Sequence, residues 1–235
     1  MSKYKRILLK LSGEALAGSQ GYGIDVKILN DFILEIKSVL DLQVQVAIVV
    51  GGGNIFRGLQ GIEKGFDRVK GDSMGMLATT INAIGISSAF ESIGVKSRVL
   101  TSTFMEPYAE RFSKKRAIET LESGEVVIFA GGTGNPFFST DTASALRAIE
   151  IEADVILKGT NVDGVYTADP KKDLNAVKFT EIKFEETLEK KLKIMDLTAF
   201  TLCMENKMPV IVFKMAEKGN LRKIVLGENI GTLVY

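Results

Sequence analysis

Two lysines stand where a positive charge is better explained by chemistry than by folding. Lys10 and Lys158 each close an apolar run that is typical of a buried strand, residues 7–9 and 155–157. A charge in such a place is costly unless it meets a partner of opposite sign, and a phosphate group would offset that cost. The two lysines are therefore candidate phosphate ligands.

Glycine is concentrated beside these lysines. The chain has 23 glycines among 235 residues, and an average protein has about 7%. Turns that contain glycine follow four of the expected strands, and their glycines lie at Gly13, at 51–53, within 131–134 and at Gly159. Such turns let the backbone approach a phosphate closely, and a following helix N-terminus favours negative charge. One such turn alone is more often only a tight turn, but four of them, with Lys10, Arg57 and Lys158 attached, predict that nucleotide phosphates bind here.

The two common nucleotide fingerprints are absent. The dipeptide Gly-Lys does not occur, which excludes a Walker A loop. The Gly-x-Gly pairs at 21/23, 51/53 and 132/134 are followed three residues later by Val26, Phe56 and Phe137 instead of glycine. The dinucleotide motif is therefore missing as well, which disfavours a nicotinamide enzyme. A phosphate-binding sheet without either motif indicates a less common kinase architecture.

Composition narrows the chemistry further. The chain contains no histidine, which excludes His-based zinc sites, the Ser-His-Asp triad and histidine as general base. The net charge of +1 gives no reason to expect a nucleic-acid or membrane partner. Cys203 is the only cysteine, and the apolar run at residues 7–9 is too short for a signal-peptide core. We therefore expect a cytoplasmic protein.

The elements that must position these residues alternate between strand and helix. This alternation predicts an α/β sandwich around a mainly parallel sheet, in which ligands bind outside the carboxyl ends of the strands. No repeat or linker interrupts the chain, and we expect one domain over residues 1–235. Strands are expected at 6–11, 44–50, 95–100, 125–130, 154–158, 209–213 and 232–235, and helices at 25–40, 71–94, 113–123, 140–151, 184–191 and 195–206.

Seven segments carry a resemblance to a known family. The chain resembles the bacterial UMP kinases (uridylate kinases) of the amino-acid-kinase superfamily over nearly its whole length. Residues 133–141 and 71–78 are specific to the UMP branch, whereas the glycine loops and residues 163–170 are shared more widely. The matching segments are residues 10–15, 51–58, 71–79, 133–141, 147–154, 161–170 and 195–200.

The resemblance implies a three-layer α/β/α sandwich and a homohexamer. It implies the transfer of a phosphoryl group from ATP to UMP in pyrimidine nucleotide synthesis, with GTP as activator and UTP as inhibitor. The N-terminal part would bind the acceptor nucleotide and the C-terminal part ATP. Mg²⁺ would be held by ATP phosphates and water, without a dedicated set of protein ligands.

The family pattern also assigns residues. Implied catalytic residues are Lys10, Arg57, Asp141 and Lys158. Implied ATP-binding residues are Lys10, Leu11, Ser12, Gly13, Gly53, Arg57, Thr160, Asn161, Tyr166 and Asp169. Implied UMP-binding residues are Gly52, Asp72, Thr133, Gly134, Asn135, Pro136, Phe137, Phe138, Ser139 and Thr140. The implied GTP segment is Gly18, Ser19, Gln20, Gly21, Tyr22 and Gly23.

Several of these residues have plain structural explanations too. Asp141 fits both a residue that orients the lysines and a helix N-terminal carboxylate. Asp72 and Asp196 fit helix N-caps, and residues 18–23 fit a flexible turn. Two other functions stay open: a superfamily kinase acting on carbamate, acetylglutamate or aspartate, and a nucleotide sensor or oxyanion-storage protein without turnover. The segment 133–141 argues against the first, and the joint presence of Lys10, Arg57, Lys158 and Asp141 argues against the second.

The absence of histidine suits the implied reaction. The second pKa of a phosphate monoester is about 6, so the acceptor is already mostly a dianion near neutral pH. Phosphoryl transfer then needs positioning and charge neutralisation, not a general base.

Overall fold

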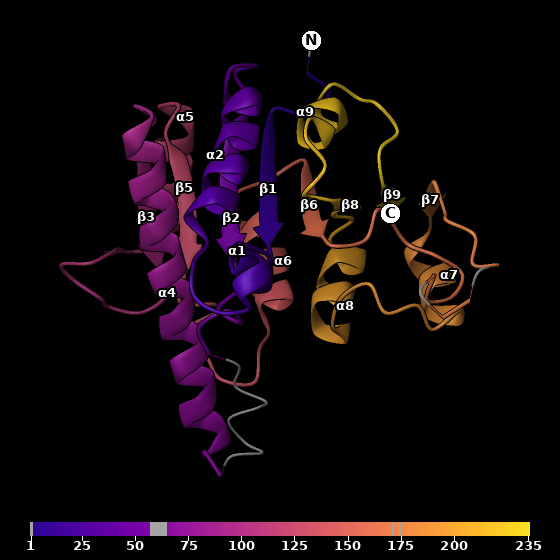
Figure 1. Ribbon diagram of the computed structural model, residues 1–235, viewed down its shortest axis with the longest axis horizontal. Helices are drawn as coiled ribbons and strands as arrows, with labels where there is room; N and C mark the ends of the chain where they lie inside the picture. The colour runs from indigo at the N-terminus through magenta and orange to yellow at the C-terminus, as the bar shows by residue number, and fades with distance from the viewer. Residues whose placement is uncertain (1, 57–64, 171, 174) are drawn as a thin grey trace.

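One mixed sheet runs through the centre of the molecule (Figure 1). The computed structural model describes residues 2–56, 65–170, 172–173 and 175–235. Within them the strand order is β4-β3-β5-β2-β1-β6-β8-β9-β7, and only the β8–β9 pair is antiparallel. The strands are β1 Arg6–Leu11, β2 Gln45–Val50, β3 Ser97–Thr101, β4 Glu110–Arg111, β5 Val126–Ala130, β6 Val155–Thr160, β7 Glu181–Ile182, β8 Val210–Lys214 and β9 Thr232–Val234.

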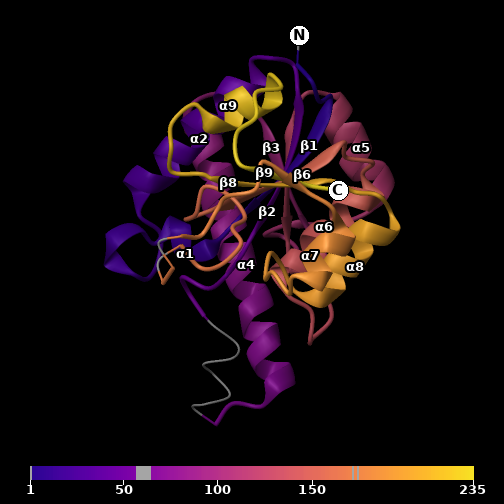
Figure 2. The ribbon, with the colours of Figure 1, turned by 90° about the vertical axis from the view of Figure 1, so that its right-hand side faces the viewer.

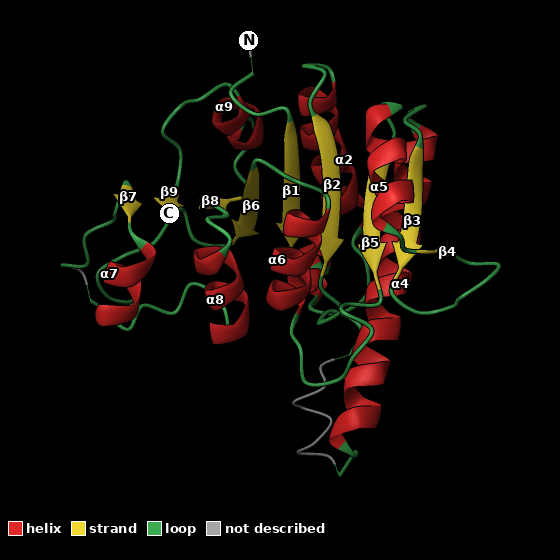
Figure 3. Ribbon diagram, turned by 180° about the vertical axis from the view of Figure 1, so that it is seen from behind, coloured by secondary structure: helices red, strands yellow, loops and turns green. Residues whose placement is uncertain are grey.

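Helices cover both faces of the sheet, which confirms the expected α/β class (Figure 2). Buried side chains of α2, α4 and α9 pack on one face, and those of α5, α6 and α8 pack on the other. Figure 3 shows the second face from its helix side. The helices are α1 Gly13–Leu16, the 3-10 helix η1 Gly18–Gln20, α2 Val26–Leu40, α4 Arg68–Ser92, α5 Lys114–Glu122, α6 Thr140–Glu150, α7 Phe184–Glu189, α8 Leu197–Glu205 and α9 Asn220–Val225.

The central strand β1 divides its side chains between the two faces. Ile7, Leu9 and Leu11 belong to the core under α2, α4 and α9. Leu8 belongs to the opposite core, under α5, α6 and α8. Because successive side chains of a strand alternate, Lys10 lies on the same face as Leu8, the face covered by α6.

The longer elements agree with the expectations from sequence, while several short ones were missed. The apolar runs of β1, β2, β5, β6 and β8 and the periodic helices α2, α5, α6, α7 and α8 lie where they were expected, within a few residues. The missed elements are α1, η1, β4, β7 and α9, none longer than six residues. So few residues do not complete enough turns or alternations to give a periodic signal.

Helix α4 begins earlier than expected, which corrects one interpretation. Its N-cap is Asp67, whose carboxylate accepts a hydrogen bond from the backbone N–H of Lys70 at 3.1 Å. Asp72 therefore lies inside the helix and is not an N-cap. The first turns of α4, which contain Asp72, extend beyond the carboxyl ends of the strands (Figure 1).

No helix in the described residues has the length and apolar composition that a bilayer span requires.

Candidate functional site

Lys10, Lys158 and Asp141 form an ion-paired cluster at the carboxyl edge of the sheet. The parallel pairing of β1 with β6 places Lys10 directly opposite Lys158. Asp141, in the first turn of α6, lies between them: Oδ1 is 2.9 Å from Lys10 Nζ and Oδ2 is 2.6 Å from Lys158 Nζ. The exposed fractions of the three side chains are 14%, 10% and 17%. One carboxylate thus bridges two ammonium groups, and the cluster carries a formal charge of +1.

The environment shifts the pKa values of two members of this cluster. Burial raises the pKa of Asp141, but the charges and hydrogen bonds of Lys10 and Lys158 outweigh it, so the pKa lies below its ordinary value. Burial is also the main effect on Lys158, and with the positive charge of Lys10 it lowers the Lys158 pKa despite the opposing attraction of Asp141. Asp141 is therefore an anion at neutral pH, and Lys158 releases its proton more readily than an ordinary lysine.

A first cavity of about 430 Å³ has in its wall Thr140, the residue before Asp141. Its walls come from the turn after β2, the outer part of α4, the loop between β5 and α6, and the first turn of α8. The residues that line it and were assigned to a nucleotide are Gly52, Gly53, Asp72, Asn135, Phe137, Phe138, Ser139 and Thr140. Thr133, Gly134 and Pro136 belong to the same loop but do not line the cavity.

Asp72 is held in place at the wall of the first cavity. Its Oδ2 accepts hydrogen bonds from Arg68 Nε at 2.8 Å and from the backbone N–H of Phe137 at 2.7 Å. The guanidinium of Arg68 also lies 5.3 Å from the centre of the Phe137 ring. Asp72 therefore fastens the loop after β5 to helix α4 across the cavity.

The loop after β5 has a backbone that favours glycine. Gly131, Gly132 and Gly134 have φ angles of 73°, 56° and 81°, in the left-handed region that other residues rarely adopt. The loop ends at Ser139, whose hydroxyl accepts from the N–H groups of Asp141 and Thr142 and caps α6. The same hydroxyl donates to Asp196, which caps α8 as the sequence suggested. The N-termini of the two helices are thereby joined beside the cavity.

A second cavity of about 660 Å³ lies beyond β6. Of the residues assigned to ATP, Thr160, Tyr166 and Asp169 line it, whereas Asn161 does not. Residues 190–194 form part of its wall, and the carbonyl of Ile194 accepts a hydrogen bond from Lys158 Nζ at 2.6 Å. Lys158 thus joins the ion-paired cluster to the wall of the second cavity.

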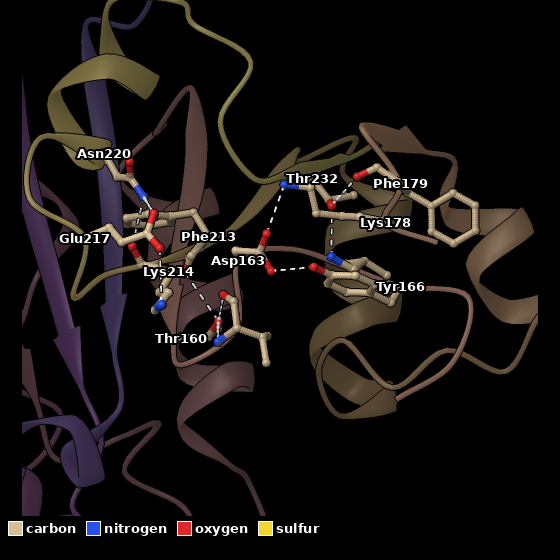
Figure 4. Close-up of polar contacts among 12 residues, drawn as sticks. Thr160, Asp163, Tyr166, Lys178, Phe179, Phe213, Lys214, Glu217, Asn220 and Thr232 are labelled. Carbon is tan, nitrogen blue, oxygen red and sulfur yellow. Dashed lines mark hydrogen bonds and ion pairs between the residues drawn. The ribbon is translucent and has the colours of Figure 1, made fainter. Parts of the chain in front are cut away.

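Tyr166 is oriented at this wall by Asp163 (Figure 4). The phenol donates to Asp163 Oδ1 at 2.7 Å, and Lys178 Nζ lies 3.1 Å from Asp163 Oδ2. Burial acts to raise the pKa of Asp163, but the hydrogen bonds from Tyr166 and Lys178 lower it overall. The same bond raises the pKa of Tyr166. Tyr166 therefore stays protonated, with its hydroxyl committed to Asp163.

The remaining assigned residues lie in the segment that follows Lys10. Leu11 ends β1, Ser12 is the N-cap residue of α1, and Gly13 begins α1. Gly18, Ser19 and Gln20 form η1, and the following residues to Gly23 continue an exposed segment before α2. Arg57 lies outside the described residues, so its assigned role stays a prediction.

The chain is similar to known proteins along its whole length. Residues 5–214 match the amino acid kinase family. A uridylate kinase from Phocaeicola vulgatus is 62% identical over 235 residues, which is 100% of each chain. The UMP kinase from Bacillus anthracis has a TM-score of 0.96 at 41% identity, over 98% of this chain and 96% of that one. The UMP kinase from Ureaplasma parvum has a TM-score of 0.93 at 36% identity, over 99% of both.

The chain belongs to the amino acid kinase family, in its uridylate kinase branch. The resemblance to this branch is therefore confirmed over the whole chain. In this uridylate kinase fold the segments 71–78 and 133–141 meet across the first cavity, at the hydrogen bond between Asp72 and Phe137.

Some residues of this candidate site were not found from the sequence. Arg68 was missed, although its spacing of four residues from Asp72 on a helix is a recognisable ion-pair signal. Asp163 was missed because only the folded chain brings its carboxylate to Tyr166 and Lys178. The Ile194 carbonyl carries no signal in the sequence, since any residue has one.

Cys203 takes no part in this chemistry. It is buried in α8, and burial together with the nearby carboxylates of Asp141 and Asp196 raises the pKa of its thiol to about 12. A thiol of that pKa is protonated at neutral pH and is a poor nucleophile.

Proposed function

We propose that the protein transfers the γ-phosphoryl group of ATP to UMP, giving ADP and UDP, without a covalent intermediate. The observation that carries this proposal is the cluster of Lys10, Lys158 and Asp141 between two cavities. Lys158 bonds to Ile194 in the wall of the second cavity, and Asp141 directly follows Thr140 in the wall of the first. A nucleotide in each cavity would direct its phosphates toward the same pair of ammonium groups.

The chemistry assigned to the cluster is charge neutralisation. The UMP phosphate is mostly a dianion near neutral pH, so its oxygen attacks the γ-phosphorus of ATP without a base, and the bond to the ADP oxygen breaks. The barrier includes the mutual repulsion of the two phosphate groups. Lys10 and Lys158 offset this repulsion, and Asp141 holds both ammonium groups on one side of the reacting phosphates. In this proposal Arg57 adds a further positive charge.

The first cavity is assigned to UMP. The Asp72 carboxylate has lone pairs beyond those used by Arg68 and Phe137, and these accept hydrogen bonds from ribose hydroxyls. The loop 133–140 encloses the base and phosphate, and Gly52 contacts the nucleotide through its backbone.

The second cavity is assigned to the adenosine part of ATP, with Thr160, Asn161, Tyr166 and Asp169 around it. The ATP phosphates then extend over the turn of Lys10, Leu11, Ser12 and Gly13 and over Gly53.

Mg²⁺ fits this arrangement as a companion of the ATP phosphates. Among the described residues no group of three or more His, Cys, Asp or Glu side chains is placed to hold a metal ion. Asp141 is engaged by two lysines, and Asp196 by Ser139, Thr142 and the N–H of Ala199. Mg²⁺ often relies on substrate phosphates and water, and when bound it supplies further positive charge to the transferred phosphoryl group.

We further propose that this activity serves pyrimidine nucleotide synthesis in the cytoplasm, in a homohexamer activated by GTP and inhibited by UTP. Helix α4 supports self-association, because Met74, Leu77, Ile81 and Ile84 expose apolar side chains along it. Exposed apolar patches on a helix commonly mark an interface. The glycine-rich segment 18–23 is the candidate for the GTP response. Sedimentation gives the assembly size, and initial rates with and without GTP or UTP test the regulation.

One assay separates the proposed function from its alternatives. ADP release from Mg²⁺-ATP is measured without acceptor and with UMP, carbamate, acetylglutamate or aspartate. We expect ADP formation that depends on UMP and exceeds that with any other acceptor. Turnover with carbamate, acetylglutamate or aspartate instead would make the protein a different kinase of the superfamily, and nucleotide binding without ADP release from any acceptor would make it a sensor.

A further inference from the structure

Two buried asparagines form a reciprocal pair behind the glycine-rich turns. Asn54 follows the turn of residues 51–53, and Asn82 lies on α4. Their exposed fractions are 4% and 0%. Asn54 Nδ2 donates to Asn82 Oδ1 at 2.9 Å, and Asn82 Nδ2 donates to Asn54 Oδ1 at 2.7 Å. Buried amides are costly unless their hydrogen bonds are made, and this pair makes them within itself and to two carbonyl groups.

The second hydrogen of each amide reaches a different glycine. Asn82 Nδ2 donates to the carbonyl of Gly51 at 2.7 Å, and Asn54 Nδ2 donates to the carbonyl of Gly23 at 2.7 Å. The N–H of Gly23 also donates to the main-chain carbonyl of Asn54 at 2.9 Å. A carbonyl oxygen only accepts hydrogen bonds, so the side-chain atom that faces each glycine carbonyl must be the amide nitrogen Nδ2. This requirement fixes the orientation of both amide groups.

The pair also supports the turn after β1. A Cβ atom at Gly13 would lie 2.4 Å from the carbonyl oxygen of Gly51 and 2.5 Å from Asn54 Oδ1. The start of α1 therefore packs without a side chain against the two atoms that the amides hold. Asn54 and Asn82 thus lie where three segments meet: the turn at Gly13, the turn at Gly51, and the end of the segment 18–23.

We propose that Asn54 and Asn82 are positioning residues for the phosphate-binding turns. Asn82 fixes the Gly51 turn, and Asn54 ties the segment 18–23 to that turn, so that a change in the segment is transmitted to the phosphates. This inference rests on the proposed binding of ATP phosphates by the turns at Gly13 and Gly53. Small displacements of groups that hold a substrate cost large factors in rate. Here the loss falls on ATP more than on UMP, because both turns, at Gly13 and at Gly53, are assigned to ATP, whereas Gly52 alone is assigned to UMP.

The two isosteric aspartate variants separate the two connections. Asn82→Asp removes the donors to Gly51 and to Asn54 Oδ1 but keeps the acceptor for Asn54 Nδ2, so the bond to Gly23 survives. Asn54→Asp removes the donors to Gly23 and to Asn82 Oδ1 but keeps the acceptor for Asn82 Nδ2, so the bond to Gly51 survives. Both variants add the same group at the same buried place, and each is therefore the matched control for the other. Asn206→Asp, at the exposed C-cap of α8, controls for the substitution itself.

The readouts are amide hydrogen exchange without nucleotide and steady-state kinetics of the full chain. For Asn82→Asp we expect faster exchange in peptides covering residues 51–56, unchanged exchange at residues 18–23, and a KM for ATP raised about tenfold or more with a smaller change for UMP. For Asn54→Asp we expect faster exchange at residues 18–23 and a smaller rise in the KM for ATP. Asn206→Asp should match the parent in both measurements.

The proposal would be overturned if both variants had the hydrogen-exchange rates and the KM for ATP of the parent. It would also be overturned if both variants showed the same pattern of faster exchange. If an aspartate variant does not fold, Asn54→Ser and Asn82→Ser remove the amide donors without adding an acid. Each also removes the acceptor for the other amide, but the remaining asparagine keeps its bond to Gly51 or to Gly23, so the same contrast in exchange is required of them. A parent without UMP-dependent turnover would refute the proposed function, whereas the exchange contrast would still test the positioning of the turns.

Discussion

The substitution Asp141→Asn tests the ion-paired cluster most directly. It keeps the size of the side chain and removes the negative charge that lies 2.9 Å from one ammonium group and 2.6 Å from the other. At an effective dielectric constant of about 20, each attraction amounts to roughly 6 kcal/mol before the cost of desolvation. Removing one partner of a buried ion pair costs about 3–5 kcal/mol in practice, because an unpaired charge stays behind. We expect the free energy of unfolding to fall by that amount at pH 7.

Urea denaturation followed by circular dichroism measures this difference. The control is Asp163→Asn, whose carboxylate pairs with Lys178 at a much more exposed place, where an ion pair contributes about 0–1 kcal/mol. Mg²⁺-ATP should stabilise Asp141→Asn more than the parent, because its phosphates would neutralise the two unpaired lysines. A variant that unfolds at the parental urea concentration, or that gains no extra stability from ATP, would refute the electrostatic role of Asp141.

The same contribution has a defined pH dependence. The pKa of Asp141 is lowered in the folded protein, so its stabilisation is complete above the ordinary aspartate pKa of about 3.9. The stabilisation is lost as the pH falls through the lowered value in the folded state. The difference in stability between the parent and Asp141→Asn should therefore be constant from pH 7 to pH 5 and shrink only in stronger acid.

Three further predictions concern the reaction. Lys10→Ala should lower kcat by about 10²-fold or more, the effect of losing one positioned charge-stabilising donor, with an unchanged circular dichroism spectrum; near-parental turnover in the folded variant would exclude that role. Asp72→Asn should raise the KM for UMP by about 10-fold or more while the KM for ATP changes little, since a hydrogen bond to a charged group contributes about 1.5–3 kcal/mol; an unchanged UMP dependence in initial rates would contradict the ribose assignment. Because burial lowers the pKa of Lys158, kcat should decline with rising pH below the ordinary lysine value of about 10.4. Lys158→Arg, whose side chain keeps its proton, should have a lower kcat than the parent, without the decline at high pH. Identical pH profiles of kcat for the parent and Lys158→Arg would show that another group titrates.

The sequence predicted the elements whose signals are local. Strands β1, β2, β5 and β6 each contain an apolar run of three or more residues, and strands buried on both faces are rich in such runs. Lys10 and Lys158 were identified because each places a charge at the end of such an apolar run. Asp141 was expected either to orient the two lysines or to be a helix N-terminal carboxylate, and it is placed to do both. The geometry of its contacts could not be predicted, since they join residues 131 and 17 positions apart and depend on the register of β1 with β6.

The start of α4 shows a limit of a different kind. Residues 68–72 have no apolar periodicity of their own, because this part of the helix extends beyond the sheet and packs around a cavity. The periodic pattern therefore begins several residues after the helix does. The interpretation of Asp72 as an N-cap failed for that reason, although its assignment to the nucleotide site did not depend on it.

The pairing of Lys10 with Lys158 makes the ion-paired cluster sensitive to the insertion of one or two residues in β1. A single residue added within β1 ahead of Lys10 would turn that ammonium toward α2 and α4, away from Asp141, because side chains alternate between the faces of a strand. Two added residues would restore the face but move the lysine by about 7 Å along the strand. Insertions of one or two residues in β1 would thus displace the apolar pattern of the strand and leave one lysine in the cluster. Insertions in the turn between α2 and β2, at the amino ends of the strands, would leave the cluster intact.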